Sequence, residues 1–110
     1  MAKSIFSKII AREIPAKIVA ENEDVIVIED IAPKAPIHYL IIPKIEVRDI
    51  QSMAPDELPI ANKLFAMAQQ LSKTVPGASH FRIVINNGER AGQRIFHLHL
   101  HFLAGEKMHD

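Results

Sequence analysis

Three histidines alternate with apolar residues near the end of the chain. His97, His99 and His101 lie within residues 95–103, and a leucine separates each histidine from the next. A β-strand sends successive side chains to opposite faces, so one strand could bury its apolar residues and line three imidazoles along its other face. Imidazole titrates near neutral pH, which suits acid–base catalysis, nucleophilic attack or metal binding.

Metal binding is the first possibility for this row. Zinc usually takes three or four protein ligands, and a His-x-His pair on a strand supplies only two. The first and third imidazoles would lie about 13 Å apart on a straight strand, so other segments must supply the remaining ligands. The chain has no cysteine, and His38, His80 and His109 occupy unrelated sequence contexts. We therefore expect neither a metal nor a cofactor.

Burial in the core and nucleophilic catalysis are the other two possibilities. Three unpaired polar groups in a core would each cost on the order of 1–3 kcal/mol, which disfavours burial of the whole row. A neutral imidazole can attack phosphorus or carbon when an acceptor holds its other nitrogen. Its imidazole neighbours could then bind an anion or carry a proton.

A polar loop directly precedes the histidines and suits a phosphate group. Residues 86–93 read Asn-Asn-Gly-Glu-Arg-Ala-Gly-Gln, which supplies amides and unhindered backbone N–H groups. Phosphates bind where several such N–H groups converge. Most glycine-rich loops are only turns, so this signal gains weight from the histidines beside it.

The rest of the chain predicts one α+β domain, residues 1–110, with an antiparallel sheet. A short helix is expected from a cap at Ser4 to about residue 12. A long helix is expected over residues 55–73, because a proline and two acidic residues favour its first turn. The predicted strands are residues 17–20, 25–28, 38–42, 81–85 and 95–103.

The long helix is apolar around more of its circumference than one sheet can cover. Its polar residues form a single stripe, and the apolar remainder exceeds the usual stripe of about 100°. We expect a partner chain to cover the excess. The alternative is that the edges of the helix are simply half exposed.

Composition argues against several classes of partner. Thirteen basic and thirteen acidic residues cancel, whereas binding to a nucleic-acid duplex favours a basic excess. No apolar run approaches the roughly 18 residues of a membrane span, and charges interrupt the N-terminal apolar residues too often for a secretory signal. The absence of cysteine fits a reducing compartment. We expect a cytoplasmic protein that binds neither nucleic acid nor membrane.

The histidine segment resembles the signature of a known family. His97-Leu98-His99-Leu100-His101-Phe102-Leu103 is similar to the motif of the histidine triad (HIT) nucleotide-binding proteins, in which histidine and apolar residues alternate. Shorter segments match in order and spacing, so the resemblance spans nearly the whole chain. These segments are residues 5–10, 13–17, 30–33, 35–38, 41–44, 84–86, 92–93 and 108–109. The chain is most similar to the Hint branch, the nucleoside phosphoramidases.

The resemblance implies a fold, an assembly and a reaction. A five-stranded antiparallel sheet would carry a long helix and a short N-terminal helix, and a homodimer would join two sheets into one of ten strands. The implied reaction cleaves the P–N bond of purine nucleoside (AMP or GMP) 5′-phosphoramidates of the AMP–amine type, or hydrolyses aminoacyl-adenylates. It proceeds through a nucleotidyl-histidine intermediate without a metal. Alternatives are a regulatory or scaffold protein with vestigial hydrolysis, and a dinucleoside polyphosphate hydrolase.

The resemblance also implies roles for particular residues. The implied catalytic residues are His99, the nucleophile, with His101 on the phosphate and His97 and His38 in a network that orients His99. The implied nucleotide-binding residues are Asp30 for the ribose; Ile5, Phe6, Ile9, Ile28 and Ile31 for the base; and Asn86, Gly92, Gln93 and Arg94 in the phosphate loop.

The chain departs from the family pattern at several positions. Glu46 stands where the family often has a histidine, which alters any proton relay through that position. Arg94 replaces a common serine, and it could either meet the phosphate or point to solvent. Ala104 precedes Gly105 where two glycines are usual, and the sequence stops at Asp110 without the longer tail of some relatives. These departures affect the substrate details more than the reaction class.

Overall fold

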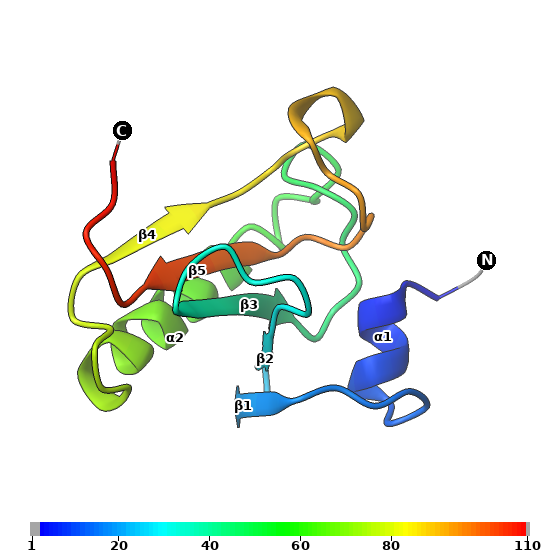
Figure 1. The fold of residues 1–110 in the computed structure, drawn as a ribbon. Helices are drawn as coiled ribbons and strands as arrows, with labels where there is room; N and C mark the ends of the chain where they lie inside the picture. Colours follow the sequence, from blue (N-terminus) through cyan, green and yellow to red (C-terminus); the bar gives the residue numbers. More distant parts are fainter. Residues whose placement is uncertain (1–2, 110) are drawn as a thin grey trace.

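One antiparallel sheet and two helices make up the fold. The structure is a computed structural model that describes residues 3–109. In chain order its elements are α1 (Ile5–Ile10), β1 (Ile18–Glu21), β2 (Val25–Glu29), β3 (Ile37–Pro43), α2 (Ile60–Thr74), β4 (Phe81–Val84), the 3₁₀ turn η1 (Glu89–Ala91) and β5 (Leu100–Ala104) (Figure 1). The strand order is β1-β2-β3-β5-β4, with every neighbouring pair antiparallel. The predicted α+β fold is confirmed.

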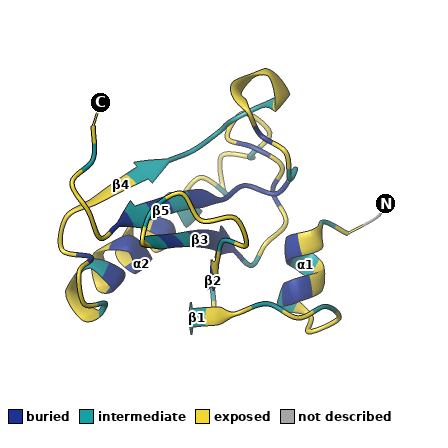
Figure 2. Cartoon of the chain, in the orientation of Figure 1, coloured by how far each residue is buried: buried dark blue, intermediate teal, exposed yellow. Residues whose placement is uncertain are grey.

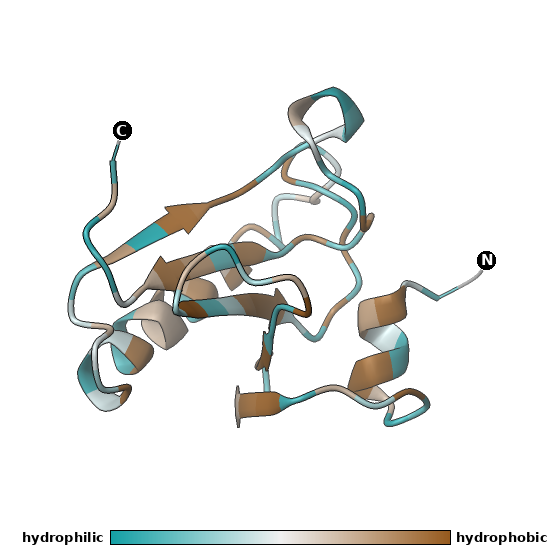
Figure 3. Ribbon diagram, viewed as in Figure 1, coloured by the Kyte–Doolittle hydropathy of each residue, from teal (hydrophilic) through white to brown (hydrophobic). Residues whose placement is uncertain are grey.

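The sheet carries an apolar cluster on each face. α2 packs on one face, where Leu64, Met67 and Leu71 meet buried side chains of β2, β3 and β5. α1 covers part of the opposite face, where Phe6 and Ile9 join a smaller cluster with residues of β2 and β3. Because both faces of these two strands are covered, β2 and β3 are almost continuously buried and apolar (Figures 2 and 3).

α1 begins at the residue that the sequence predicted. The hydroxyl oxygen of Ser4 accepts the backbone N–H of Ser7 at 2.9 Å, which makes Ser4 the N-cap. The helix ends at Ile10, slightly earlier than expected, and Arg12 then adopts a left-handed backbone conformation with φ of 62°. This turn directs the chain from α1 into β1.

α2 begins later than the predicted start at residue 55. Pro59 has no N–H group, so it cannot make the bond to residue 55 that an α-helix requires. Residues 55–59 form turns instead, in which the N–H of Glu57 donates to Ala54 O at 2.8 Å and the N–H of Ile60 donates to Glu57 O at 3.0 Å. The prediction overlooked this second proline.

β5 also begins later than predicted, at Leu100 and not at residue 95. Its register with β3 pairs Leu100 with Ile41, so Leu98 would come opposite Pro43. Proline cannot donate a ladder hydrogen bond, and the pairing therefore ends at this point.

The three histidines therefore do not share one face of one strand. Only His101 lies in β5, whereas His97 and His99 occupy the segment before it, which bends at residues 95–97. The N–H of Leu98 donates to Val47 O at 2.7 Å, so this segment is held by the loop that follows β3. The prediction of a straight histidine strand is wrong for its first half.

Candidate active site

A cleft of about 460 Å³ lies on the face of the sheet that α2 leaves uncovered. β3 and β5 place His38, Leu40 and His101 on this face, because Leu40 and His101 are directly paired. The loops after β2 and between β4 and β5 form its walls. The lining residues are Asp30, Ala32, Lys34, His38, Leu40, Val84, Asn86, Gly92, Arg94, Ile95, His99, His101 and Leu103.

His99 has one ring nitrogen held and the other open. Its Nδ1–H donates to the carbonyl oxygen of His97 at 2.8 Å, and a carbonyl only accepts, so the neutral ring carries its lone pair on Nε2. Nε2 makes no hydrogen bond within residues 3–109, where every fully buried side-chain nitrogen or oxygen has a partner. Nε2 is therefore open to the cleft, although the residue as a whole is only 8% exposed. An imidazole in this state can attack an electrophile.

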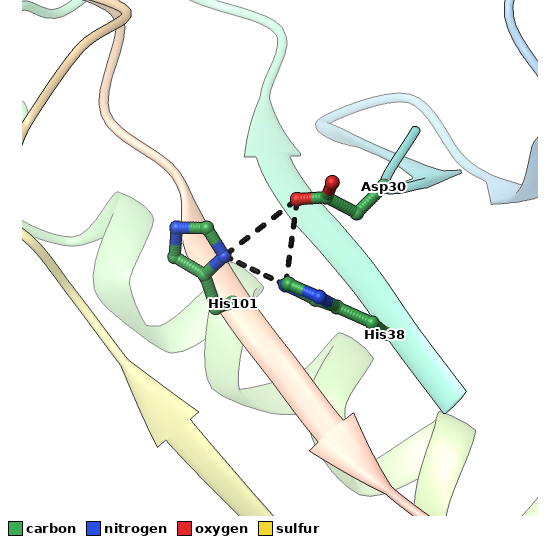
Figure 4. Close-up of side chains that lie close together, drawn as sticks. All are labelled: Asp30, His38 and His101. Carbon is green, nitrogen blue, oxygen red and sulfur yellow. Dashed lines mark hydrogen bonds and ion pairs between the residues drawn. The ribbon is translucent and has the colours of Figure 1, made fainter. Parts of the chain in front are cut away.

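His38 and His101 form a hydrogen-bonded pair (Figure 4). The ring of His99 lies next to that of His101, with ring centroids 5.2 Å apart. The backbone N–H of Lys34 donates to Nδ1 of His38 at 3.0 Å, so neutral His38 carries its proton on Nε2. That Nε2–H donates to Nδ1 of His101 at 2.9 Å. His101 consequently carries its own proton on Nε2, on the side of the ring away from His38. The pair thus presents an N–H donor to the cleft.

Asp30 approaches both members of this pair with one carboxylate oxygen (Figure 4). Its Oδ2 lies 3.4 Å from Nε2 of His38 and 4.0 Å from Nδ1 of His101. Its other oxygen, Oδ1, accepts the backbone N–H of Ala32 at 2.8 Å, which fixes the carboxylate at the end of β2.

Asp30, His38 and His101 offer three potential metal-ligand atoms within 4.8 Å of one another. His38 follows no ligand spacing in the sequence, but the resemblance placed it in the network of the triad, and in the structure it bonds to His101. A neutral imidazole coordinates through an unprotonated nitrogen, however, and the N–H of Lys34 leaves the proton of His38 on the very atom that faces His101. His38 and His101 are therefore arranged to bond to each other, and the three residues do not fit a metal ion.

His97 lies behind the cleft and is completely buried. Its Nε2–H donates to the carbonyl oxygen of Pro43 at 2.8 Å, so Nδ1 accepts the hydroxyl of Ser4 at 2.7 Å. The ring of Phe6 packs edge-on against His97 and His99, with ring centroids 5.7 Å and 5.0 Å apart. His97 is thus a buried histidine with both ring nitrogens hydrogen-bonded, and its carbonyl oxygen accepts the Nδ1–H of His99.

An apolar slot of about 800 Å³ adjoins the cleft. All five residues expected around a base line it: Ile5, Phe6, Ile9, Ile28 and Ile31. The slot shares Asp30, Leu40 and Ile95 with the cleft, which makes the two cavities continuous. Leu40 and Ile95 could not be predicted as site residues, because an apolar residue in or near a strand looks like any core residue.

The loop between β4 and β5 contributes Asn86, Gly92 and Arg94 to the cleft. Gly92 has a left-handed backbone with φ of 97°, a conformation that favours glycine. Arg94 is exposed.

The side chain of Gln93 does not line the cleft. We expected it to contact the nucleotide, and this prediction is wrong, because the side chain is buried and points into the loop. Its amide donates to the carbonyls of residues 48 and 95 and accepts the N–H of residue 88, so Gln93 holds the loop together.

Comparison with known proteins identifies the family. A family model described as the HIT domain matches residues 11–108. The chain belongs to the HIT family.

Related HIT proteins cover the chain almost from end to end. It is 42% identical to a HIT-like protein of Synechocystis over 93% of this chain and 90% of that one, and 37% identical to protein HitA of Neisseria gonorrhoeae over 94% and 96%. A HIT family hydrolase from Clostridium thermocellum superposes with a TM-score of 0.93 at 37% identity and covers 100% of this chain and 96% of that one. A histidine triad protein from Clostridium difficile has the same TM-score at 32% identity, covering 100% and 98%. The chain therefore has the fold of HIT family hydrolases.

Burial keeps the histidines of this HIT protein neutral. Desolvation is the largest cause that lowers the pKa of His38, His97 and His99. Desolvation also lowers the pKa of His101 to about 4, with further contributions from the neighbouring His99 and His38. A neutral imidazole with an open lone pair and a neutral imidazole with an N–H donor thus coexist in one cleft.

The lowered pKa values predict how the site responds to acid. Because charging costs desolvation, each ring should gain its second proton only below pH 6.5, the usual midpoint of histidine, and His101 should do so near pH 4. Ring ¹⁵N chemical shifts, followed by NMR from pH 8 to pH 4, measure each midpoint. We expect the neutral Nε2–H form of His101 to persist through pH 5. A midpoint above 6.5 for His99 would contradict the role of burial.

Proposed function

We propose that this chain is a nucleoside phosphoramidase of the Hint branch, which cleaves the P–N bond of purine nucleoside 5′-phosphoramidates of the AMP–amine type, or the P–O bond that joins AMP to the acyl group in aminoacyl-adenylates. The observation that carries the proposal is the ring of His99, whose Nδ1–H is held by a carbonyl while Nε2 faces the cleft. The adjoining apolar slot and the polar loop supply surfaces of the right chemistry for a base and a phosphate.

The reaction proceeds in two displacements at phosphorus. The lone pair of His99 Nε2 forms a bond to phosphorus as the P–N bond breaks, and the departing nitrogen takes a proton from solvent to leave as the amine. Water then attacks phosphorus, the bond to Nε2 breaks, and the proton lost by water returns to solvent. The sum is phosphoramidate plus water giving nucleotide plus amine. The carbonyl of His97 stabilises the Nδ1–H of the cationic intermediate throughout.

The remaining site residues bind the nucleotide in this proposal. The Nε2–H of His101 and the amide of Asn86 donate to the phosphate oxygens, the backbone at Gly92 lies against the phosphate, and Arg94 adds a positive charge at the rim. Asp30, which lines both the cleft and the slot, accepts hydrogen bonds from the ribose hydroxyls. The slot is apolar and stacks adenine or guanine, so AMP and GMP derivatives are both candidate substrates.

The deciding experiment detects the covalent intermediate. The protein is mixed briefly with adenosine 5′-phosphoramidate, quenched, and examined by intact mass spectrometry and peptide mapping, while AMP is measured in a parallel reaction. We expect AMP release and a transient adenylyl group on His99. A folded wild-type protein that binds AMP but forms neither product would reject the proposal and favour a nucleotide-binding regulatory or scaffold role.

The cationic side chains of the cleft support one further candidate substrate class. Lys34 and Arg94 both line the cleft, and additional phosphates would meet them favourably. Hydrolysis of dinucleoside polyphosphates is therefore the second candidate function. Chromatography of the products from such a substrate, beside the phosphoramidate assay, separates the two activities.

We also propose that the chain acts as a homodimer joined through α2 and the free edge of β4. Phe65 on α2 is 59% exposed and Phe81 on the edge strand is 40% exposed, so both present apolar surface to solvent. Phe65→Glu should convert the dimer to a monomer in sedimentation velocity. Ile18→Glu places the same change on β1, at the opposite edge of the sheet, and should leave the dimer intact. A monomeric wild type would contradict the proposal.

The expected location and partners stay predictions. Within residues 3–109, neither helix has the length and hydropathy that crossing a membrane requires. Cytoplasmic location and the lack of nucleic-acid binding rest on composition alone.

A further inference from the structure

Glu46 lies outside the cleft and is tied to the start of α1. The loop after β3 carries Glu46, and its Oε1 accepts the backbone N–H of Ser4 at 3.0 Å and the hydroxyl of Ser7. These two bonds lower the pKa of Glu46, with the Ser7 hydroxyl as the largest cause. α1 has only six residues, too few to be stable in isolation, so external contacts must hold its first turn.

The same first turn of α1 contacts the histidine segment. The hydroxyl of Ser4 accepts the N–H of Ser7 and donates to Nδ1 of His97, so its orientation is fixed on both sides. Phe6, in the same first turn, packs against the rings of His97 and His99. Movement of this turn would therefore displace His97 and the wall of the apolar slot together.

His97 transmits this constraint to His99. Both ring nitrogens of His97 are bonded, one to the hydroxyl of Ser4 and the other to the carbonyl of Pro43, which fixes the ring in two directions. The carbonyl of the same residue accepts the Nδ1–H of His99 at 2.8 Å. Release of Ser4 would remove one of the two anchors behind that carbonyl.

We infer that Glu46 is a positioning residue: by clamping the first turn of α1 through Ser4 and Ser7, it holds His97 so that His99 presents Nε2 to the substrate. This inference rests on the proposed function. Glu46 itself does not line the cleft; it lines a separate hollow that shares only Arg94 and Ile95 with the cleft. What the clamp requires is an oxygen that accepts two hydrogen bonds, and a negative charge is not essential.

That requirement makes glutamine and alanine a decisive pair of substitutions. Glu46→Gln keeps an acceptor oxygen, whereas Glu46→Ala removes it. Glu13→Ala is the matched control, because the Glu13 carboxylate also pairs within the N-terminal segment, with Lys3 at 2.7 Å, but makes no hydrogen bond to Ser4 or Ser7. The three variants and the wild type are compared for unfolding temperature, AMP affinity and the single-turnover rate of adenylyl transfer to His99.

We expect Glu46→Ala to slow adenylyl transfer about tenfold, because supporting groups behind a catalytic residue typically contribute 10–100-fold. Glu46→Gln and Glu13→Ala should stay within about threefold of the wild type. If Glu46→Ala fails to fold, Ser7→Ala, which removes one of the two bonds, should show a slowing of about fivefold, beyond the range expected for the controls. Equal rates for the alanine variants at positions 46 and 13 would overturn the inference. So would a glutamine variant as slow as the alanine variant, since charge would then be the cause.

A second readout does not depend on turnover. The Nδ1–H proton of His99 is held by the carbonyl of His97, and its exchange with water can be measured by NMR in the free protein. Exchange should become about tenfold faster in Glu46→Ala and remain unchanged in Glu46→Gln and Glu13→Ala. Absence of adenylyl transfer in the wild type would reject the proposed function alone. Unchanged exchange in Glu46→Ala would reject the clamp alone.

Discussion

We expect the variant His99→Ala to lose kcat for adenosine 5′-phosphoramidate by about 10⁴-fold or more while it binds AMP within about fivefold of the wild type. The nucleophile acts in the bond-forming step, and no other imidazole can take its place. The ring of His97 is fully buried with both nitrogens bonded, and His101 presents an N–H to the cleft where His99 presents a lone pair.

Binding should survive because the surfaces that hold the nucleotide are separate from the attacking atom. Other residues form the apolar slot and the loop with Asn86 and Gly92, and the ring of His99 supports the slot only by packing against Phe6. Steady-state kinetics and calorimetric titration with AMP measure the two effects independently. A variant that can no longer bind AMP would make His99 a binding residue.

A matched control separates loss of the nucleophile from a general effect of removing a histidine. His80 is exposed, precedes β4 and does not line the cleft. His80→Ala should therefore keep kcat and AMP affinity near wild-type values. A value of kcat for His99→Ala within tenfold of the wild type would require a different attacking group.

The positions of most helices and strands could be predicted from the sequence, because local patterns of apolar and turn-forming residues determine them. Strands β1 to β4 and helix α1 came within a residue or two of the predicted positions, since alternation, caps and turn residues are local signals. The two larger errors, the starts of α2 and β5, each have one local cause, a proline. Pro59 shortens α2 at its start, and Pro43 ends the pairing that β5 would otherwise continue.

The sequence also predicted most of the candidate site, because the resemblance supplied the positions and the fold brings them together. His99, His101, Asn86 and Gly92 line one cleft, and the five predicted apolar residues line the adjoining slot. Gln93 could not be placed correctly, because an amide in a phosphate loop looks the same whether it faces a ligand or the interior. Only the three hydrogen bonds of its side chain decide that question.

The hydrogen-bond partners behind the site could not be predicted. Ser4 was identified as a helix cap, but its contact with His97 joins residues 93 positions apart. Lys34 acts through its backbone N–H, which carries no sequence signal. These two hydrogen bonds form only when α1 and the loop after β2 pack against the histidines. They help to determine which nitrogen of His97 and of His38 carries the proton.

The proton on His38 is the basis of the last prediction. His101 donates to the cleft only while its own Nδ1 accepts the Nε2–H of His38. Without that donor, neutral His101 can place its proton on Nδ1, toward Oδ2 of Asp30 at 4.0 Å, and turn a lone pair toward the phosphate. A wrong tautomer of a catalytic imidazole costs roughly 10⁴-fold in a serine protease. His101 is not the nucleophile here, so we expect His38→Leu to lower kcat by about 10²- to 10³-fold.

His38→Gln is the variant that isolates this effect. The side-chain NH₂ of glutamine can reach the place of the Nε2–H and donate to His101, whereas leucine of similar size cannot. Both substitutions remove the ring acceptor of the Lys34 N–H, so that loss is common to the two variants. We expect His38→Gln to keep kcat within about tenfold of the wild type, and the ¹⁵N shifts of His101 to report the Nε2–H tautomer in His38→Gln and a mixture in His38→Leu. Equal kcat values for the two variants, with His101 in the same tautomer, would show that the donor at Nε2 of His38 does not govern the reaction, and that burial of His101 beside Asp30 is sufficient to orient it.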